Sequence, residues 1–307
     1  MPIAALLLPL VPMVVRESRA EVVTGRSFDV IGAVLGTGGL LAIIFGVIRA
    51  QPLGWGSPEV LGCLAAGAAL LVAFFFVEKR SADPLVPLPL FRLRSLRMAS
   101  ASLAINGGAF LSMFFLTAIF LQQVRGESAL GTGLQLLPMG VAAVVGAGFA
   151  SNLVQRLGTR AVQTTGALLS TAGLWYLSTA NAHTSYGGGI LPGLLLLGAG
   201  ITTIGVPGQI AAVAEVDHEQ SGAASGLVTA GYQVGGALGI ALITTLSTNA
   251  VTHALAGGSS RPDALVEGFQ RGLLIAAAFS AFNVVLSLAS PKIAPEAEQM
   301  AAALAGA

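Results

Sequence analysis

Long apolar runs, separated by short clusters of charged residues, form the main pattern of the chain. Charge-free stretches cover residues 1–15, 30–48, 60–77, 98–124, 128–155, 161–214, 220–260 and 272–291. A helix needs about 20 mostly apolar residues to cross a bilayer, and most of these stretches hold one such segment. The stretch 161–214 is long enough for two segments, because the polar, glycine-rich run 181–189 divides it with a turn signal.

The pattern therefore predicts an all-α, polytopic membrane protein with about nine hydrophobic segments. They lie at about 1–15, 29–48, 59–77, 98–121, 134–153, 161–180, 189–211, 224–247 and 270–290. The first is short for a span, and a cleaved signal peptide or an interfacial segment is an alternative. A truncated span is favoured, because the segment has neither a basic start nor a small-residue cleavage site.

The composition supports a membrane protein and excludes several other classes. Hydrophobic residues make up 54% of the 307 residues and charged residues only 9%, whereas soluble domains carry roughly 25% charged residues. So few charges cannot cover a water-facing surface, which excludes a soluble enzyme and a disordered chain. The net charge of +1 gives no sign of a nucleic-acid partner, and the single Cys63 cannot form an intrachain disulfide.

The basic residues are divided unequally between the two sets of alternating loops, 11 in one set and 4 in the other. Loops rich in lysine and arginine stay in the cytoplasm. This predicts a multi-pass protein of the cell membrane, with the C-terminus cytoplasmic and the N-terminus outside. The preference for arginine over lysine, with abundant alanine and glycine, suggests a GC-rich bacterial genome, and the expected location is then the inner membrane of a bacterium. The larger set is Arg16, Arg19, Arg26, Lys79, Arg80, Arg92, Arg94, Arg97, Arg156, Arg160 and Lys292, and the smaller is Arg49, Arg125, Arg261 and Arg271.

Ionisable residues inside spans usually mark function, and here they are nearly absent. Every acidic residue and every histidine falls in a loop or at the end of a predicted span. The sequence thus predicts no catalytic residue, no metal site and no cofactor, and it argues against a membrane enzyme. The acidic run 215–219 is interpreted as a solvated loop. Proton coupling would have to come from residues outside this chain.

The residues in the middle of the predicted spans that could bind a solute are uncharged polar residues and aromatic residues. Asn106, Phe110 and Phe114 are spaced four apart and so share one helix face. They fit the wall of an apolar cavity for an amphipathic solute, but the amides could equally bond across helices, and both readings stay open. The predicted substrate-binding residues are Asn106, Phe110, Phe114, Gln209, Tyr232, Gln233 and Asn283.

Glycines spaced every four residues predict close helix packing. Gly231, Gly235 and Gly239 line one face of the segment 224–247. Small residues on one face let two backbones approach in a membrane, where apolar burial gives little drive for association. We interpret this stripe as structural.

Three stretches together resemble one family. Residues 79–97 contain a Pro-Leu pair before Leu-Phe-Arg, residues 120–138 contain Leu-Gln, Gly-Glu-Ser, Gly-Leu and Leu-Pro in order, and the segment 221–241 contains repeated glycine motifs. In this order they resemble fourteen-helix multidrug:proton antiporters (EmrB/QacA-type) of the major facilitator superfamily.

The resemblance implies a division of the chain along that family's plan. Two six-helix halves are joined by two extra helices and work by alternating access. On this plan 1–15 is the end of the N-terminal half and 16–77 holds the two linker helices. A basic cytoplasmic connector follows at 78–97. Residues 98–290 form the six-helix C-terminal half, and 291–307 form a cytoplasmic tail.

Residues 152–160 resemble the weaker, C-terminal copy of the superfamily's cytoplasmic loop motif. Arg156, Gly158 and Arg160 match it, whereas Gln155 stands where an acidic residue is usual. The resemblance implies multidrug efflux by proton antiport, in a chain that lacks most of its N-terminal half. The expected partners are the lipid bilayer and an amphipathic small molecule, with protons only if that half is supplied. The alternative is a non-transporting remnant, or a half-transporter that needs a partner.

Overall fold

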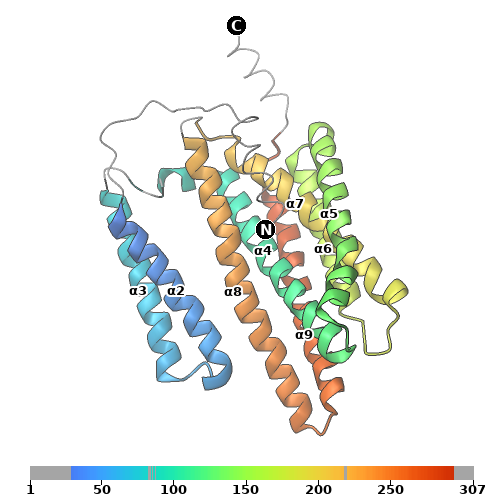
Figure 1. The fold of residues 1–307 in the computed structure, drawn as a ribbon. Helices are drawn as coiled ribbons and strands as arrows, with labels where there is room; N and C mark the ends of the chain where they lie inside the picture. The colour runs from blue at the N-terminus through green and yellow to red at the C-terminus, as the bar shows by residue number, and fades with distance from the viewer. Residues whose placement is uncertain (1–28, 82–83, 85, 87, 218–219, 294–307) are drawn as a thin grey trace, which may run out of the picture.

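We describe residues 29–81, 84, 86, 88–217 and 220–293 of a computed structural model. All regular structure in these residues is helical, which confirms the all-α fold (Figure 1). The long helices are α2 (Val30–Leu53), α3 (Pro58–Arg80), α4 (Arg94–Ile119), α5 (Ala129–Leu157), α6 (Thr159–Leu177), α7 (Leu191–Val213), α8 (Ser221–Ala256) and α9 (Arg261–Ala289). Three short helices join them: η1 (Leu88–Arg92) is a 3₁₀ turn, and η2 (Phe120–Val124) and η3 (Tyr186–Ile190) are π-helices.

These eight long helices coincide with eight of the nine predicted segments, and the segment 1–15 lies outside the described residues. Seven of the helices in this part of the chain are long and apolar enough to cross a membrane. The eighth, α6, is shorter and more polar, with Gln163 and Ser170 on its buried face. It packs against α7 and α9, so other helices rather than lipid surround these polar groups.

Helix α8 extends well beyond its predicted bounds of 224–247. Its 36 residues correspond to about 54 Å at 1.5 Å per residue, whereas the hydrocarbon core is about 30 Å thick. The polar residues after the apolar core do not interrupt the helix. It ends only at Gly257, before Gly258 with its φ of 88°. The change from apolar to polar residues thus indicates where the helix leaves the membrane, whereas the glycines at 257 and 258 determine where the helix ends.

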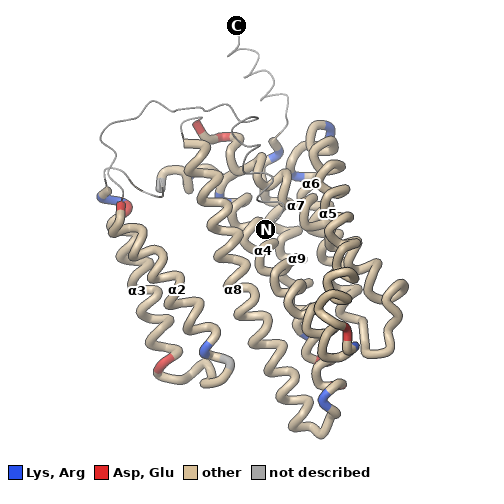
Figure 2. The backbone as a smooth tube through the Cα atoms, viewed as in Figure 1, with Lys and Arg blue, Asp and Glu red and all other residues tan. Residues whose placement is uncertain are grey.

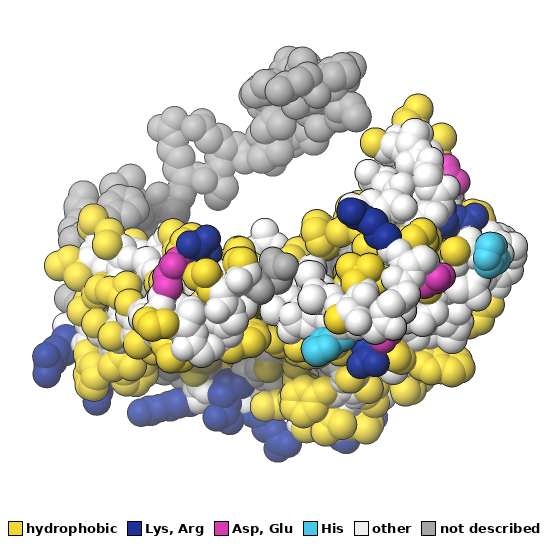
Figure 3. Space-filling model, turned by 90° about the horizontal axis from the view of Figure 1, so that it is seen from below, with side chains coloured by type: hydrophobic (Ala, Val, Ile, Leu, Met, Phe, Trp, Pro, Cys, Tyr) yellow, Lys and Arg dark blue, Asp and Glu magenta, His cyan; other side chains and the backbone are white. Residues whose placement is uncertain are grey.

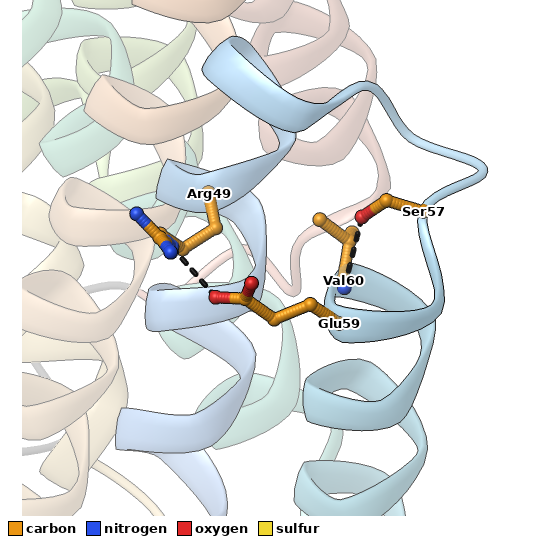
Figure 4. Close-up of polar contacts among 4 residues, drawn as sticks. All are labelled: Arg49, Ser57, Glu59 and Val60. Atoms are coloured by element: carbon orange, nitrogen blue, oxygen red, sulfur yellow. Dashed lines mark hydrogen bonds and ion pairs between the residues drawn. The ribbon is translucent and has the colours of Figure 1, made fainter.

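Helices α2 and α3 form a hairpin at one edge of the molecule, beside α8 (Figure 1). At its turn the Arg49 Nε lies 2.8 Å from the Glu59 Oε1, and the Ser57 hydroxyl accepts a hydrogen bond of 3.2 Å from the Val60 N–H (Figure 4). The ion pair joins the two helices directly, while Ser57 caps the start of α3.

Close backbone contact joins α4 to α8 in the six-helix bundle α4–α9. A Cβ atom added at Gly235 would lie 2.2 Å from the carbonyl oxygen of Ala104, and one at Gly239 would lie 2.3 Å from the Cα of Gly108. No larger side chain fits at either position. The structure therefore confirms the packing role for Gly235 and Gly239, whereas an added Cβ atom at Gly231 would lie 3.9 Å from its nearest neighbour.

The bundle consists of two similar groups of three helices. Helix α4 packs mainly on α8 and α9, and α7 packs mainly on α5 and α6. The first and fourth helices of the bundle thus occupy equivalent positions. Internal repeats of this kind are typical of transporter folds.

Charged residues gather at the two ends of the molecule (Figure 2). We call the end where α3 stops, α4 starts and α5 turns into α6 the basic end. From the opposite end, where α8 meets α9, hydrophobic side chains cover most of the visible flanks (Figure 3). Apolar flanks with charged ends fit a protein that spans a bilayer. The described basic residues of the basic end are Lys79, Arg80, Arg92, Arg94, Arg97, Arg156, Arg160 and Lys292.

Candidate functional site

The two asparagines among the predicted binding residues are buried between helices. The Asn106 Nδ2 donates a hydrogen bond of 3.3 Å to the carbonyl of Ile201, which joins α4 to α7. The Asn283 Nδ2 donates one of 3.1 Å to the carbonyl of Ser102, which joins α9 to α4. Both contacts fit the reading that these amides bond across helices, and a direct contact with a substrate stays a prediction.

The two predicted phenylalanines lie on α4 in different surroundings. Phe110 packs against the buried core of the bundle, whereas Phe114 is 44% exposed. Their ring centroids are 6.3 Å apart with the planes tilted by 52°. The pair thus extends from the core to the surface of α4, where Phe114 can meet an apolar molecule.

The remaining three predicted residues lie on α7 and α8. Gln209 and Gln233 are exposed, and Tyr232 is partly buried against apolar residues. The backbone of Tyr232 lies in the tight contact with α4, since a Cβ atom at Gly107 would be 2.4 Å from its carbonyl oxygen. The structure therefore fixes the position of Tyr232 relative to α4 and leaves both glutamine side chains accessible.

Hollows open between the helices at two places, and none of the seven predicted substrate-binding residues lines either of them. The first, which we call the η2 hollow, has a volume of about 190 Å³ and lies among α4, η2, α8 and α9. At its wall the rings of Phe120 and Phe269 stack with centroids 4.2 Å apart. The π-helix η2 widens the backbone here, and such π segments are frequent at functional sites.

The second hollow, which we call the α5–α6 groove, has a volume of about 410 Å³ and lies where α5 and α6 diverge over α7. Each hollow lies within one of the two three-helix groups, the first among α4, α8 and α9 and the second among α7, α5 and α6. No residue type at regular spacing marks either hollow in the sequence, because each arises from the angles between helices. The groove is lined by Ala142, Val145, Gly146, Phe149, Ala150, Leu153, Thr165, Leu169, Leu195, Ala199 and Thr203.

The loop motif forms the turn between α5 and α6 at the basic end. Gly158 has a φ of 78°, a conformation that favours glycine, and its N–H closes α5 on the carbonyl of Val154 at 2.9 Å. The Thr159 N–H donates to the carbonyl of Ile293 at 3.2 Å, so the chain after α9 packs on this turn. Arg156 and Arg160 are exposed on either side of Gly158.

In the part of the chain that the structure describes, the acidic side chains lie near helix ends or in loops. The Asp29 Oδ1 accepts from the Gly32 N–H at 2.7 Å and caps α2, and the Glu215 Oε2 accepts from the Ser95 hydroxyl at 2.5 Å. Glu78, only 2% exposed at the end of α3, accepts from the Val86 N–H at 3.2 Å. No group of three histidine, cysteine or acidic side chains that could hold a metal ion occurs among the described residues.

A comparison of the sequence with protein families settles its affiliation. The family model of the Major Facilitator Superfamily matches residues 3–240. The chain belongs to the Major Facilitator Superfamily. This confirms the superfamily that the sequence motifs suggested. Because this is a superfamily of transporters, the match together with the seven apolar helices also confirms a multi-pass membrane protein of a transporter family rather than an enzyme.

Several curated proteins of this superfamily are similar to the chain. It is 34% identical to the puromycin resistance protein pur8 of Streptomyces alboniger over 86% of the chain and 53% of that protein. It is 34% identical to the tetracenomycin C resistance and export protein of Streptomyces glaucescens over 81% of the chain and 46% of that protein. The multidrug resistance protein Stp of Mycobacterium tuberculosis is 32% identical over 79% of the chain and 44% of its own length. The chain spans about half the length of the curated relatives it matches.

Proposed function

We propose that helices α4–α9 form the C-terminal half of a multidrug efflux transporter of the fourteen-helix type. This half works with an N-terminal half to export amphipathic or cationic small molecules by proton antiport. The observation that carries the proposal is the match to the superfamily together with relatives whose names record drug resistance or antibiotic export. The hairpin α2–α3, packed beside α8, fits the two linker helices of that plan.

Protons are the proposed coupling ion only when an N-terminal half is present. In the described helices every acidic side chain lies within about two turns of a helix end. Proton relays in transporters use carboxylates or histidines inside the membrane. The described helices offer no such group at mid-membrane depth, so the N-terminal half has to supply it.

The proposed substrate contacts are the predicted side chains that a solute can reach. Phe114, Gln209 and Gln233 are exposed, and Phe110 and Tyr232 are partly buried beside them on the same helices, α4 and α8. Rings and uncharged amides suit a lipophilic molecule, because they offer apolar area and a few hydrogen bonds without a fixed charge. In this proposal the buried amides of Asn106 and Asn283 support the site by holding α4, α7 and α9 together.

The proposed orientation places the basic end of the bundle in the cytoplasm of a bacterium. Loops with excess lysine and arginine remain on the cytoplasmic side, and the basic residues concentrate at this end (Figure 2). The C-terminus is then inside and the N-terminus outside.

Drug resistance of bacteria that lack their own efflux pumps tests the proposal. The chain is produced together with the N-terminal half of a related fourteen-helix transporter, and growth is measured across a panel of amphipathic and cationic drugs. We expect resistance to at least one class of drug, with none from either half alone. If the combined halves assemble in the membrane and give no resistance across the panel, the alternative of a non-transporting half is favoured.

A further inference from the structure

The α5–α6 groove is an apolar channel with α7 as its floor. At Gly146 an added Cβ atom would lie 2.9 Å from the Cα of Ala199, so α5 touches α7 closely there. On the other side of this contact α6 diverges from α5, which leaves the volume of about 410 Å³. The Thr165 hydroxyl at its edge already donates to the carbonyl of Ala161 at 3.0 Å. The lining is therefore suited to a hydrocarbon chain.

The length of the groove matches one leaflet of a bilayer. Along α5 the lining extends from Ala142 to Leu153, about 16 Å at 1.5 Å per residue. Half of a hydrocarbon core of about 30 Å is about 15 Å. Val145 and Phe149 on its rim are 51% and 65% exposed, so the groove opens sideways from the bundle.

Three basic residues, Arg156, Arg160 and Lys292, lie on or against the α5–α6 turn that follows the lining of this groove along α5, and we call them the basic turn. Arg156 follows Leu153 by about one helical turn, and Arg160 precedes Thr165 by about one and a half turns. The Lys292 side chain packs over Gly158, since a Cβ atom there would lie 3.6 Å from its Cγ. Among the described residues, the ion pairs of the structure involve none of these three side chains.

The acidic residue that usually accompanies this motif is replaced by Gln155, so the basic turn has no acidic neighbour within the motif. The N–H of Thr159 at the start of α6 is already bonded to Ile293. This donor is therefore not available to an anion at the turn, whereas the exposed side chains of Arg156 and Arg160 are.

We propose that the α5–α6 groove binds an acyl chain of an anionic phospholipid whose phosphate is held by the basic turn. The groove supplies an apolar site one leaflet long, and the basic turn supplies positive charge at the depth of the headgroup. Basic pockets between membrane helices on the cytoplasmic side bind anionic headgroups in this way. The site is distinct from the proposed substrate contacts, because none of the seven predicted substrate residues lines the groove, and the proposal does not depend on what the chain transports.

Lipid titration of the purified full chain in detergent tests this proposal, with bound lipids counted by native mass spectrometry. Phosphatidylglycerol and phosphatidylcholine with identical acyl chains are compared. Each basic residue near an anionic headgroup strengthens binding about five-fold, so the double variant R156Q/R160Q should weaken phosphatidylglycerol binding about thirty-fold. Phosphatidylcholine binding should stay unchanged. The matched control K79Q/R80Q removes the same charge at the end of α3, away from the groove, and should change binding less than about three-fold.

A second pair of variants tests the apolar part of the site. A142F places a ring in the groove and should weaken the binding of both lipids, whereas V144F adds the same ring on an α5 residue that does not line the groove. Equal binding of the two lipids by the unmodified chain would overturn the proposal. A loss of phosphatidylglycerol binding in K79Q/R80Q equal to that in R156Q/R160Q would also overturn it. Displacement of the lipid by inorganic phosphate or glycerol phosphate would show a site for free anions instead, which also overturns it.

Discussion

The contact between α4 and α8 yields the sharpest prediction for stability. In Gly235→Ala the new Cβ atom would lie 2.2 Å from the carbonyl oxygen of Ala104 and 2.6 Å from its Cα. An ordinary contact begins at 3.4 Å, so the two backbones have to separate locally by about 1.2 Å. Neither neighbour is a flexible side-chain end that could move aside.

Such overpacking costs about 1–3 kcal/mol in a well-packed interior. For a bundle of this size each kcal/mol corresponds to roughly 2–4 °C in the unfolding temperature. We therefore expect Gly235→Ala to lower the midpoint of thermal unfolding in detergent by several degrees, even though alanine favours a helix over glycine by about 1 kcal/mol.

Two glycines on the same helix provide matched controls. At Gly226 an added Cβ atom meets nothing within 4 Å, and at Gly231 its nearest contact is 3.9 Å away. Alanine at either position should leave the midpoint unchanged or raise it slightly. If Gly235→Ala proves as stable as these two variants, the close packing of α4 on α8 is not what holds the bundle together and our reasoning fails.

Three further predictions follow from other contacts. Gly158→Ala should destabilise the turn between α5 and α6 by about 1–2 kcal/mol, because its φ of 78° disfavours a side chain; limited proteolysis at this turn provides the measurement. Asn283→Ala should lower the free energy of unfolding by about 0.6 kcal/mol, the typical value of a hydrogen bond between membrane helices, because it removes the bond to the carbonyl of Ser102. Denaturant unfolding measures this, and a midpoint equal to that of the unmodified chain would contradict the prediction. Tyr232→Ala in the assembled two-half transporter should change the pattern of drug resistance at equal expression, and an unchanged pattern across a broad panel would exclude a substrate contact there.

The sequence predicts the helices well because each depends on local composition. An apolar run of about 20 residues without charges has few alternatives to a membrane helix, and this identified α2–α9. Only the ends were misjudged, as in α8, because the helix continues past the apolar run until Gly257. The glycine stripe was also readable, since spacing by four places Gly231, Gly235 and Gly239 on one helix face.

The site is predicted much less well, because polarity alone does not say what a side chain faces. Asn106 and Gln233 look alike as polar residues inside apolar runs, yet the first is buried against Ile201 and the second is exposed. The α5–α6 groove could not be predicted at all, since it depends on the divergence of two helices rather than on any motif. A pattern along one helix thus reveals a face, and only the packing of several helices reveals a cavity.

Efflux of a fluorescent lipophilic cation from energised cells tests the central claim most directly. Cells producing these 307 residues alone are compared with cells that also produce a compatible N-terminal half, with and without a protonophore. We predict efflux only when both halves are present, and its loss when the protonophore collapses the proton gradient. Protonophore-sensitive efflux from the 307 residues alone would contradict the account, because the described helices would then couple protons without an acidic group at mid-membrane depth.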